Sequence, residues 1–239
     1  MSSEKLTVFE EGQVLLFDKP LYWTSFDLVN KVRNILRSRL GLKKIKVGHA
    51  GTLDPLASGL MIICTGRATK QIDSFRDLDK EYVATFTAGA TTPSFDLETE
   101  TDAIFPVDHI TEDLLKEKIN SFLGEQNQMP PIYSAKLIAG KRAYEFARKG
   151  IHKELDPVTV HFRELELLSF NLPEIKIRMR CSKGTYIRSF ARDLGVALES
   201  GCYLSALIRT SIGSYKVEEA MSLEKFTEFV EHYKSAHVS

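Results

Sequence analysis

The order of helix-like and strand-like segments along the chain is the feature that most restricts its fold. Apolar and polar residues alternate, as in half-buried strands, over residues 82–88, 158–170 and 175–181, and the last two segments are candidates for pairing. Apolar residues recur with helical spacing over residues 25–39, 111–123, 189–199 and 222–233. No regular strand–helix–strand repeat connects these segments. We therefore predict an α+β fold with a largely antiparallel, mixed central sheet flanked by helices.

Local signals at residues 25–39 predict where that helix starts and stops. Ser25 is expected to be the N-cap, because its hydroxyl can accept a hydrogen bond from a backbone N–H of the first turn. Phe26 is expected on the apolar face, together with Val29 and Val32. Gly41 is expected to end the helix, since glycine readily adopts the left-handed conformation at a helix C-terminus.

Size and composition restrict the class of protein. A chain of 239 residues can form one large domain, and because no linker or repeat divides it we expect a single domain over residues 1–239. The N-terminus lacks the apolar segment of a secretory signal, and the apolar runs are too short to span a bilayer, so we expect a cytoplasmic protein that does not enter a membrane. Cys64, Cys181 and Cys202 form no CxxC pair, which argues against a disulfide framework or a zinc site.

The charges are segregated although they sum to zero, with 32 basic and 32 acidic residues. Residues 31–46 contain seven Lys or Arg and residues 176–192 contain six, and neither segment contains an acid. Acidic residues are concentrated in 96–113 and 218–231. This distribution favours binding to a polyanion such as a nucleic acid, but a basic face in contact only with solvent would have the same composition.

Residues 48–60 form the most informative stretch for function. Three glycines and one proline within twelve residues predict a tightly shaped loop. Asp54 lies in this loop, directly before Pro55 and an apolar run, so its carboxylate is expected at the edge of the core. An Asp-Pro pair that only shapes a turn is the alternative, and for this pair alone it would be the better interpretation.

Seven segments in order along the chain carry a resemblance to a known family: residues 17–20, 47–60, 66–70, 79–82, 130–136, 140–145 and 183–188. In these segments the sequence strongly resembles the TruB family of tRNA pseudouridine synthases. The resemblance implies the pseudouridine synthase fold and an isomerase that converts uridine 55 in the T-loop of tRNA to pseudouridine. The target base would be flipped out of the RNA for an aspartate-dependent glycosidic rearrangement. An isomerisation needs no redox cofactor or nucleotide, and we expect no cofactor and no metal.

The resemblance also assigns catalytic residues. Asp54 matches the catalytic carboxylate, which would attack the sugar or the base or remove a sugar proton; the sequence leaves these routes open. Arg188 matches the cation that pairs with this carboxylate, and without the resemblance it would be read as a phosphate contact or a solvated arginine. Tyr82 matches the tyrosine that stacks on the uracil, and would otherwise be assigned to the core.

Further residues match positions that bind the RNA. His49 matches the histidine that fills the space of the flipped base, Tyr186 and Leu207 match residues lining the base pocket, and Lys70 is a candidate phosphate contact. Residues 126–153 resemble a thumb-like insertion that holds the T-loop, and they include Tyr133 and Lys136. The expected partner is the T-arm stem-loop of tRNA, bound by a monomer that requires no protein partner.

The chain departs from the family pattern at two places. Tyr22 stands where the family usually has glycine, so the turn around it is expected to be built differently. The sequence ends at Ser239, just past the last predicted helix, and we expect no separate C-terminal RNA-binding (PUA-like) domain. A non-catalytic RNA-binding protein and a carboxylate-dependent N-glycosidase are the two competing functions.

Overall fold

The computed structural model describes residues 7–133, 137–138, 141–142 and 155–237. The chain forms two compact units, one of Met1–Lys80 with Ile208–Ser239 and the other of Glu81–Leu207. Strand β12 (Cys202–Ile212) contributes its first half to the second unit and its second half to the first unit. The expectation of a single domain stays a prediction.

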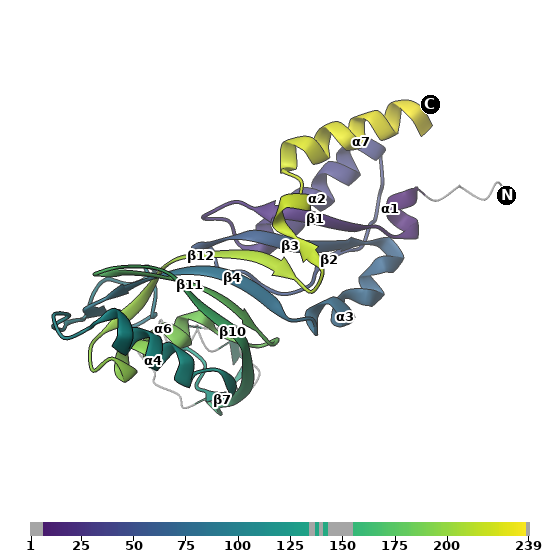
Figure 1. The fold of residues 1–239 in the computed structure, drawn as a ribbon. Coiled ribbons are helices and arrows are strands. Elements are labelled where there is room, and N and C mark those ends of the chain that lie inside the picture. The colour runs from purple at the N-terminus through teal and green to yellow at the C-terminus, as the bar shows by residue number, and fades with distance from the viewer. Residues whose placement is uncertain (1–6, 134–136, 139–140, 143–154, 238–239) are drawn as a thin grey trace. The chain divides into compact units, whose positions relative to one another are not determined.

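The first unit is built on antiparallel strands. β1 (Val14–Lys19) pairs with β3 (Ala57–Thr65), β2 (Val47–His49) also pairs with β3, and the end of β12 pairs with β13 (Tyr215–Lys216). The strand order in this unit is β1-β3-β12 (Figure 1). Its helical elements are α1 (Val8–Glu11), α2 (Ser25–Leu40), η1 (Gly66–Gln71), α3 (Ile72–Arg76), η2 (Val217–Glu219) and α7 (Leu223–His237).

Helix α2 begins and ends almost as predicted. The N-cap is Thr24, not Ser25, because Thr24 and Asp27 form a reciprocal capping box. Gly41 ends the helix in the left-handed conformation, with φ of 68°. The prediction for Phe26 is wrong, since this side chain is 64% exposed.

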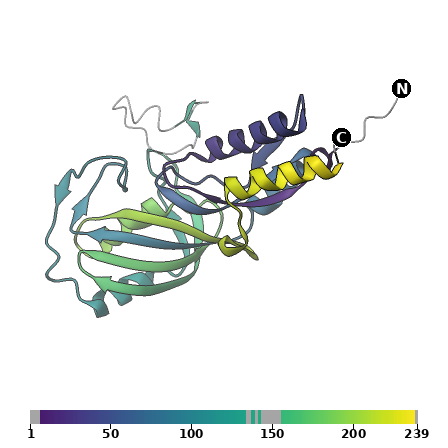
Figure 2. The same ribbon diagram turned by 90° about the horizontal axis from the view of Figure 1, so that it is seen from above.

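Helix α7 lies along α2, as both views show (Figures 1 and 2). Phe226 of α7 is fully buried and its ring meets Phe9 and Phe17 edge-on at centroid distances of 6.2 and 5.2 Å. Glu231 of α7 pairs with Arg39 of α2 at 3.2 Å. The acidic C-terminal helix therefore neutralises part of the basic helix.

The second unit has the strand order β12-β4-β11-β10-β7. These strands are β4 (Lys80–Ala88), β11 (Glu174–Cys181), β10 (Val158–Asn171) and β7 (Gly124–Gln128). The predicted pairing of residues 158–170 with 175–181 is confirmed, with two register shifts. Two short strand pairs lie outside this sheet, β5 (Ala90–Thr91) with β6 (Ala103–Ile104) and β8 (Leu137–Ile138) with β9 (Lys141–Arg142).

In the described part of this unit two helices cover these strands. α4 (Glu112–Ser121) packs on β10 and on α6 (Ile187–Ala197). Phe190 of α6 is buried at the centre, with its ring 5.6 Å from Phe86, 5.0 Å from Phe122 and 5.2 Å from Phe162. The predicted α+β class with a mostly antiparallel sheet is confirmed.

Most of the predicted thumb-like insertion at residues 126–153 lies outside the described residues, and its role stays a prediction. Among the described residues no helix is long and apolar enough to cross a membrane. The same part of the chain contains no cluster of three or more His, Cys, Asp or Glu that would suit a metal ion.

Candidate active site

The loop that carries Asp54 connects β2 to β3, and hydrogen bonds hold its backbone at each of six consecutive residues. The bonds are Ala50 N–H to Ile62 O (3.0 Å), Arg209 to Gly51 O (3.2 Å) and Thr52 O (3.5 Å), the Ser25 hydroxyl with Leu53 N–H (2.8 Å) and O (3.0 Å), Ala57 N–H to Asp54 O (3.1 Å), and Tyr22 N–H to Pro55 O (2.7 Å). Asp54 itself is half-buried. The loop therefore presents one carboxylate on a fixed backbone, as a catalytic group requires.

Arg209 is the largest fully buried side chain in the described part of the protein, with 1% exposure. Its guanidinium donates to Leu60 O at 2.7 Å as well as to the two loop carbonyls, so one planar cation joins the start of the loop to β3. Gly59 allows this arrangement, because a Cβ there would lie 2.4 Å from Arg209 O. Sequence reasoning missed Arg209, since a single arginine on an alternating strand gives no signal of its own.

Two side chains near the start of α2 act on the same loop, Ser25 through hydrogen bonds and Lys19 through its charge. The hydroxyl of Ser25 is buried and binds both backbone groups of Leu53, which explains why the capping position falls to Thr24 instead. Lys19 is fully buried, and its Nζ donates to Pro20 O (2.9 Å) and Trp23 O (2.6 Å). Burial lowers the pKa of Lys19 to about 8, and the negative charge of Asp54 acts in the opposite direction. Lys19 thus supplies a positive charge near Asp54 that the sequence analysis had not assigned.

His49 ends β2, five residues before Asp54. Burial lowers the pKa of its imidazole, so the ring is neutral at pH 7. Its Nδ1 is buried and has no hydrogen-bond partner among the described residues. Lys70, on η1 in the same unit, is exposed, as a phosphate contact must be.

Arg188 lies in the second unit, on the first turn of α6. Its Nε is 3.5 Å from a carboxylate oxygen of Asp96, and each side chain is only 6% exposed. Its two terminal nitrogens donate to Ser94 O (3.3 Å) and Tyr133 O (2.9 Å). The structure thus pairs Arg188 with Asp96, an acid that sequence reasoning did not select. The pairing of Arg188 with Asp54 stays a prediction, because the two residues belong to different units.

The remaining predicted residues of the second unit are placed as follows. Tyr82 on β4 and Leu207 on β12 are buried, with 8% and 9% exposure, on strands that are neighbours in the sheet. Tyr186 is half-buried directly before α6, and the buried side-chain amide of Gln128 binds both its N–H (2.8 Å) and its carbonyl (3.0 Å). Tyr133 contributes its carbonyl to Arg188, whereas Lys136 lies outside the described residues.

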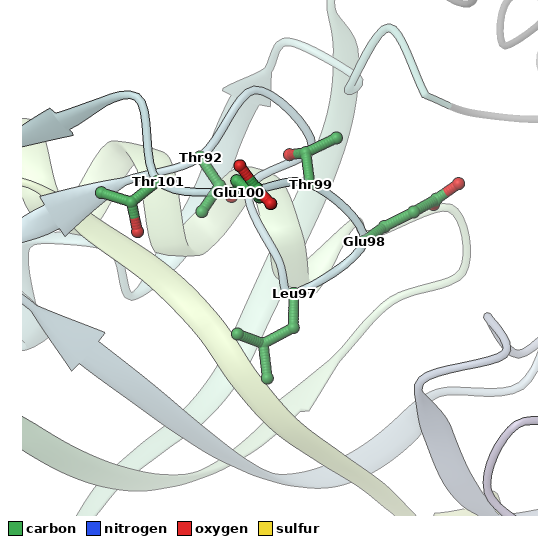
Figure 3. A pocket seen from close by; sticks show the side chains of 6 residues that line it. All are labelled: Thr92, Leu97, Glu98, Thr99, Glu100 and Thr101. Carbon is green, nitrogen blue, oxygen red and sulfur yellow. The ribbon is translucent and has the colours of Figure 1, made fainter.

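A pocket of about 400 Å³ in the second unit contains none of the predicted site residues. It is lined by Thr92 and by residues 97–101, from the loop between β5 and β6 (Figure 3). Leu97 points away from Thr99 and Glu100 in this view. Two glutamates and no cation line the pocket, so it does not suit an RNA phosphate.

Four of the six cations in residues 176–192 have carboxylate partners. Arg178 contacts Glu166 and lies 3.8 Å from Glu81, and Arg180 lies 3.5 Å from Glu164. Arg188 and Arg192 are also paired, with Asp96 and Asp193. The acids come mainly from the neighbouring strands, which the count of charges within one segment could not show.

Comparisons with known proteins agree with the resemblance. A family model described as "TruB family pseudouridylate synthase (N terminal domain)" matches residues 37–187, more than half of the chain. The tRNA pseudouridine synthase B of Phocaeicola vulgatus is 56% identical over 230 residues, which are 96% of this chain and 98% of that protein. The tRNA pseudouridine synthase B of Flavobacterium johnsoniae is 53% identical over 219 residues, 91% of this chain and 96% of that protein.

A solved structure shows the same fold. A chain in the crystal structure of a Cbf5-Nop10-Gar1 complex superposes with a TM-score of 0.72 at 27% identity, over 97% of this chain and 58% of that chain. The family match, the identity to relatives of nearly the same length and the shared fold agree with one another. The chain therefore belongs to the TruB family of pseudouridylate synthases.

Proposed function

We propose that this protein converts uridine 55 in the T-loop of tRNA to pseudouridine, with Asp54 as its catalytic carboxylate. As a TruB family member it is an isomerase that acts on RNA. The observation that carries the role of Asp54 is its loop, in which a half-buried carboxylate stands on a backbone held by hydrogen bonds from residue 50 to residue 55. A non-catalytic RNA-binding protein would not need a carboxylate held in this way against a polyanion.

The chemistry requires one bond to break and one to form. The bond from uracil N1 to the ribose C1′ breaks, the base turns over, and C5 joins C1′, while the proton on C5 is lost and N1 gains one. Atoms and electrons balance without a further reactant. A fixed carboxylate can assist by attack on the sugar or base, or by removal of a sugar proton. Lys19 supports the carboxylate with a nearby positive charge. Arg209 supports it by holding the backbone of its loop.

Each of the other predicted residues receives a role in this proposal. Tyr82 stacks on the uracil, Arg188 supplies positive charge, and Tyr186 and Leu207 contact the base. His49 fills the space left by the flipped base. Lys70, Tyr133 and Lys136 contact the RNA outside the base. We also propose that the protein acts as a cytoplasmic monomer on the T-arm without a protein partner.

The test is pseudouridine mapping of tRNA incubated with the purified protein and with its Asp54→Asn variant. The native protein is expected to modify uridine 55 and the variant to form no pseudouridine above background, because the substitution keeps the shape and removes the charge. Binding of tRNA by the variant should stay within about tenfold, a difference of roughly 1.4 kcal/mol. Turnover by Asp54→Asn would remove Asp54 from the mechanism, and release of free uracil by the native protein would indicate a glycosidase instead.

A further inference from the structure

Tyr22 combines backbone strain with exposure. It lies in the turn of residues 20–23 between β1 and α2, and its φ of 67° is in the left-handed region. A non-glycine residue in this region is disfavoured by roughly 1–2 kcal/mol. The side chain is 76% exposed, so burial in the fold does not offset this strain. Such outliers concentrate at functional sites, where the surrounding structure holds them.

The turn is held in this conformation from two directions. The ammonium group of Lys19 binds the carbonyls of Pro20 and Trp23, at 2.9 and 2.6 Å. The N–H of Tyr22 donates to Pro55 O at 2.7 Å. Tyr22 therefore occupies a conformation typical of glycine, the residue that the family usually has at this position.

The second of these bonds places Tyr22 beside the catalytic loop. Pro55 directly follows Asp54, and both belong to the same unit as Tyr22. Two more large apolar side chains close in the sequence are exposed, Leu21 at 45% and Phe26 at 64%. An exposed aromatic ring, on a residue whose backbone binds the residue after the candidate catalytic Asp54, fits the face of an unpaired base, which stacks on aromatic side chains.

We propose that Tyr22 is a positioning residue that stacks on the nucleotide adjacent to the target uridine. A target base that leaves the RNA stack deprives its neighbour of a stacking partner, and Tyr22 supplies an alternative one. This inference rests on the proposed function, because it needs an RNA nucleotide at Asp54. It gives Tyr22 a role in binding and in the choice of substrate, separate from the chemistry.

Binding experiments on the protein side test the role of the ring. The Kd for a T-arm stem-loop is measured in the Asp54→Asn background, so that no turnover takes place. Tyr22→Gly and Tyr22→Asn both tolerate positive φ but lack the ring, and each is expected to weaken binding roughly 5- to 150-fold, as loss of one stacked base does. Tyr22→Phe keeps the ring and is expected to stay within about twofold. Ile104→Ala, which truncates a side chain that is 85% exposed in the second unit, is the matched control and should not change the Kd.

Thermal unfolding of the same variants separates this role from a folding defect. Tyr22→Gly relieves strain in the folded turn but also gains freedom in the unfolded chain, so it should unfold within a few degrees of the parent. A large loss of stability together with weak binding would overturn the proposal, because the ring would then serve the fold.

A change on the RNA side tests which group the ring contacts. Stem-loops with an abasic residue on either side of the target uridine are bound to the Tyr22 protein and to Tyr22→Gly. At one of the two positions the abasic residue should weaken binding to the Tyr22 protein and leave binding to Tyr22→Gly unchanged. Equal losses for both proteins at both positions would overturn the proposal. This outcome differs from failure of the proposed function, which would be a lack of pseudouridine formation by the protein with Asp54.

Discussion

At the scale of single residues, the groups around Asp54 show which parts of the site the sequence could predict. Asp54 and His49 stand out because glycines and a proline surround them in a short segment. Arg209 and Ser25 act on the same loop from distant positions, and their roles depend on contacts that form only in the folded chain. Arginine and serine are common in many settings, so neither residue type signals such a contact.

Lys19 gives this loop a measurable pH dependence. Its pKa is lowered by burial to about 8 from 10.5, so between these values the unfolded chain binds more protons than the folded protein. Stability from this group therefore rises with pH from about 8 to 10.5, by roughly 3 kcal/mol at most. Below pH 8 the amine is charged in both states and the burial penalty applies in full.

The measurement compares urea unfolding of the native protein and of Lys19→Met across this pH range. Other titrating groups affect both proteins alike, and the carbonyls of Pro20 and Trp23 lose a donor in the variant at every pH. The free energy of unfolding should therefore increase more with pH for the native protein than for Lys19→Met. A difference that is constant from pH 7 to 10 would contradict the lowered pKa.

At the scale of helices and strands, the sequence predicts where an element lies along the chain better than which distant segments it contacts. The strands 158–170 and 175–181 were predicted because alternation reports burial on one face, and their pairing follows from a short turn. The N-cap of α2 was misplaced by one residue, since Thr24 and Ser25 both carry hydroxyls and only the folded loop shows which one caps. The link between Arg188 and Asp96 joins α6 to the loop after β5, segments far apart in the chain.

This link should be visible as coupling between the two residues. Arg188→Met leaves the buried carboxylate of Asp96 without its cation and is expected to destabilise the protein by roughly 3–5 kcal/mol. Adding Asp96→Asn removes the charge, keeps a side-chain oxygen for the N–H of Glu98 and should recover part of the loss. Chemical unfolding of the four proteins of this cycle measures the coupling.

Arg192 provides the control on the same helix. Its guanidinium pairs with the adjacent Asp193 and lies 5.2 Å from the centre of the Phe95 ring, but it is partly exposed. Arg192→Met should therefore change stability by less than about 1 kcal/mol and show no coupling to Asp96→Asn. Additive effects of Arg188→Met and Asp96→Asn would show that the two side chains do not stabilise each other.

At the scale of the whole molecule, the family was recognised from ordered segments that extend over most of the chain, and the family match confirms it. The charge distribution was predicted less well, because pairing depends on which segments become neighbours. Both basic segments lack an acid, but their surroundings differ. Four cations of residues 176–192 have carboxylate partners, whereas Lys43, Lys44 and Lys46 are exposed and have no ion-pair partner among the described residues.

Of these cations, only the exposed lysines without an ion-pair partner among the described residues should contribute to RNA binding. A cation that is already paired gains little from a phosphate, while a free lysine displaces counterions from the RNA on binding. Replacing Lys43, Lys44 and Lys46 together by Gln should weaken tRNA binding and reduce the slope of log Kd against log salt by about 2–3, close to one unit per lost contact. The control replaces Arg178 and Arg180 by Gln, which removes two cations held by Glu166 and Glu164 and should leave the slope unchanged. Titrations at several salt concentrations measure both slopes. If the arginine variant lost as much slope as the lysine variant, the ion pairs on β10 and β11 would have to open for RNA, and the binding surface would include the second unit's strands.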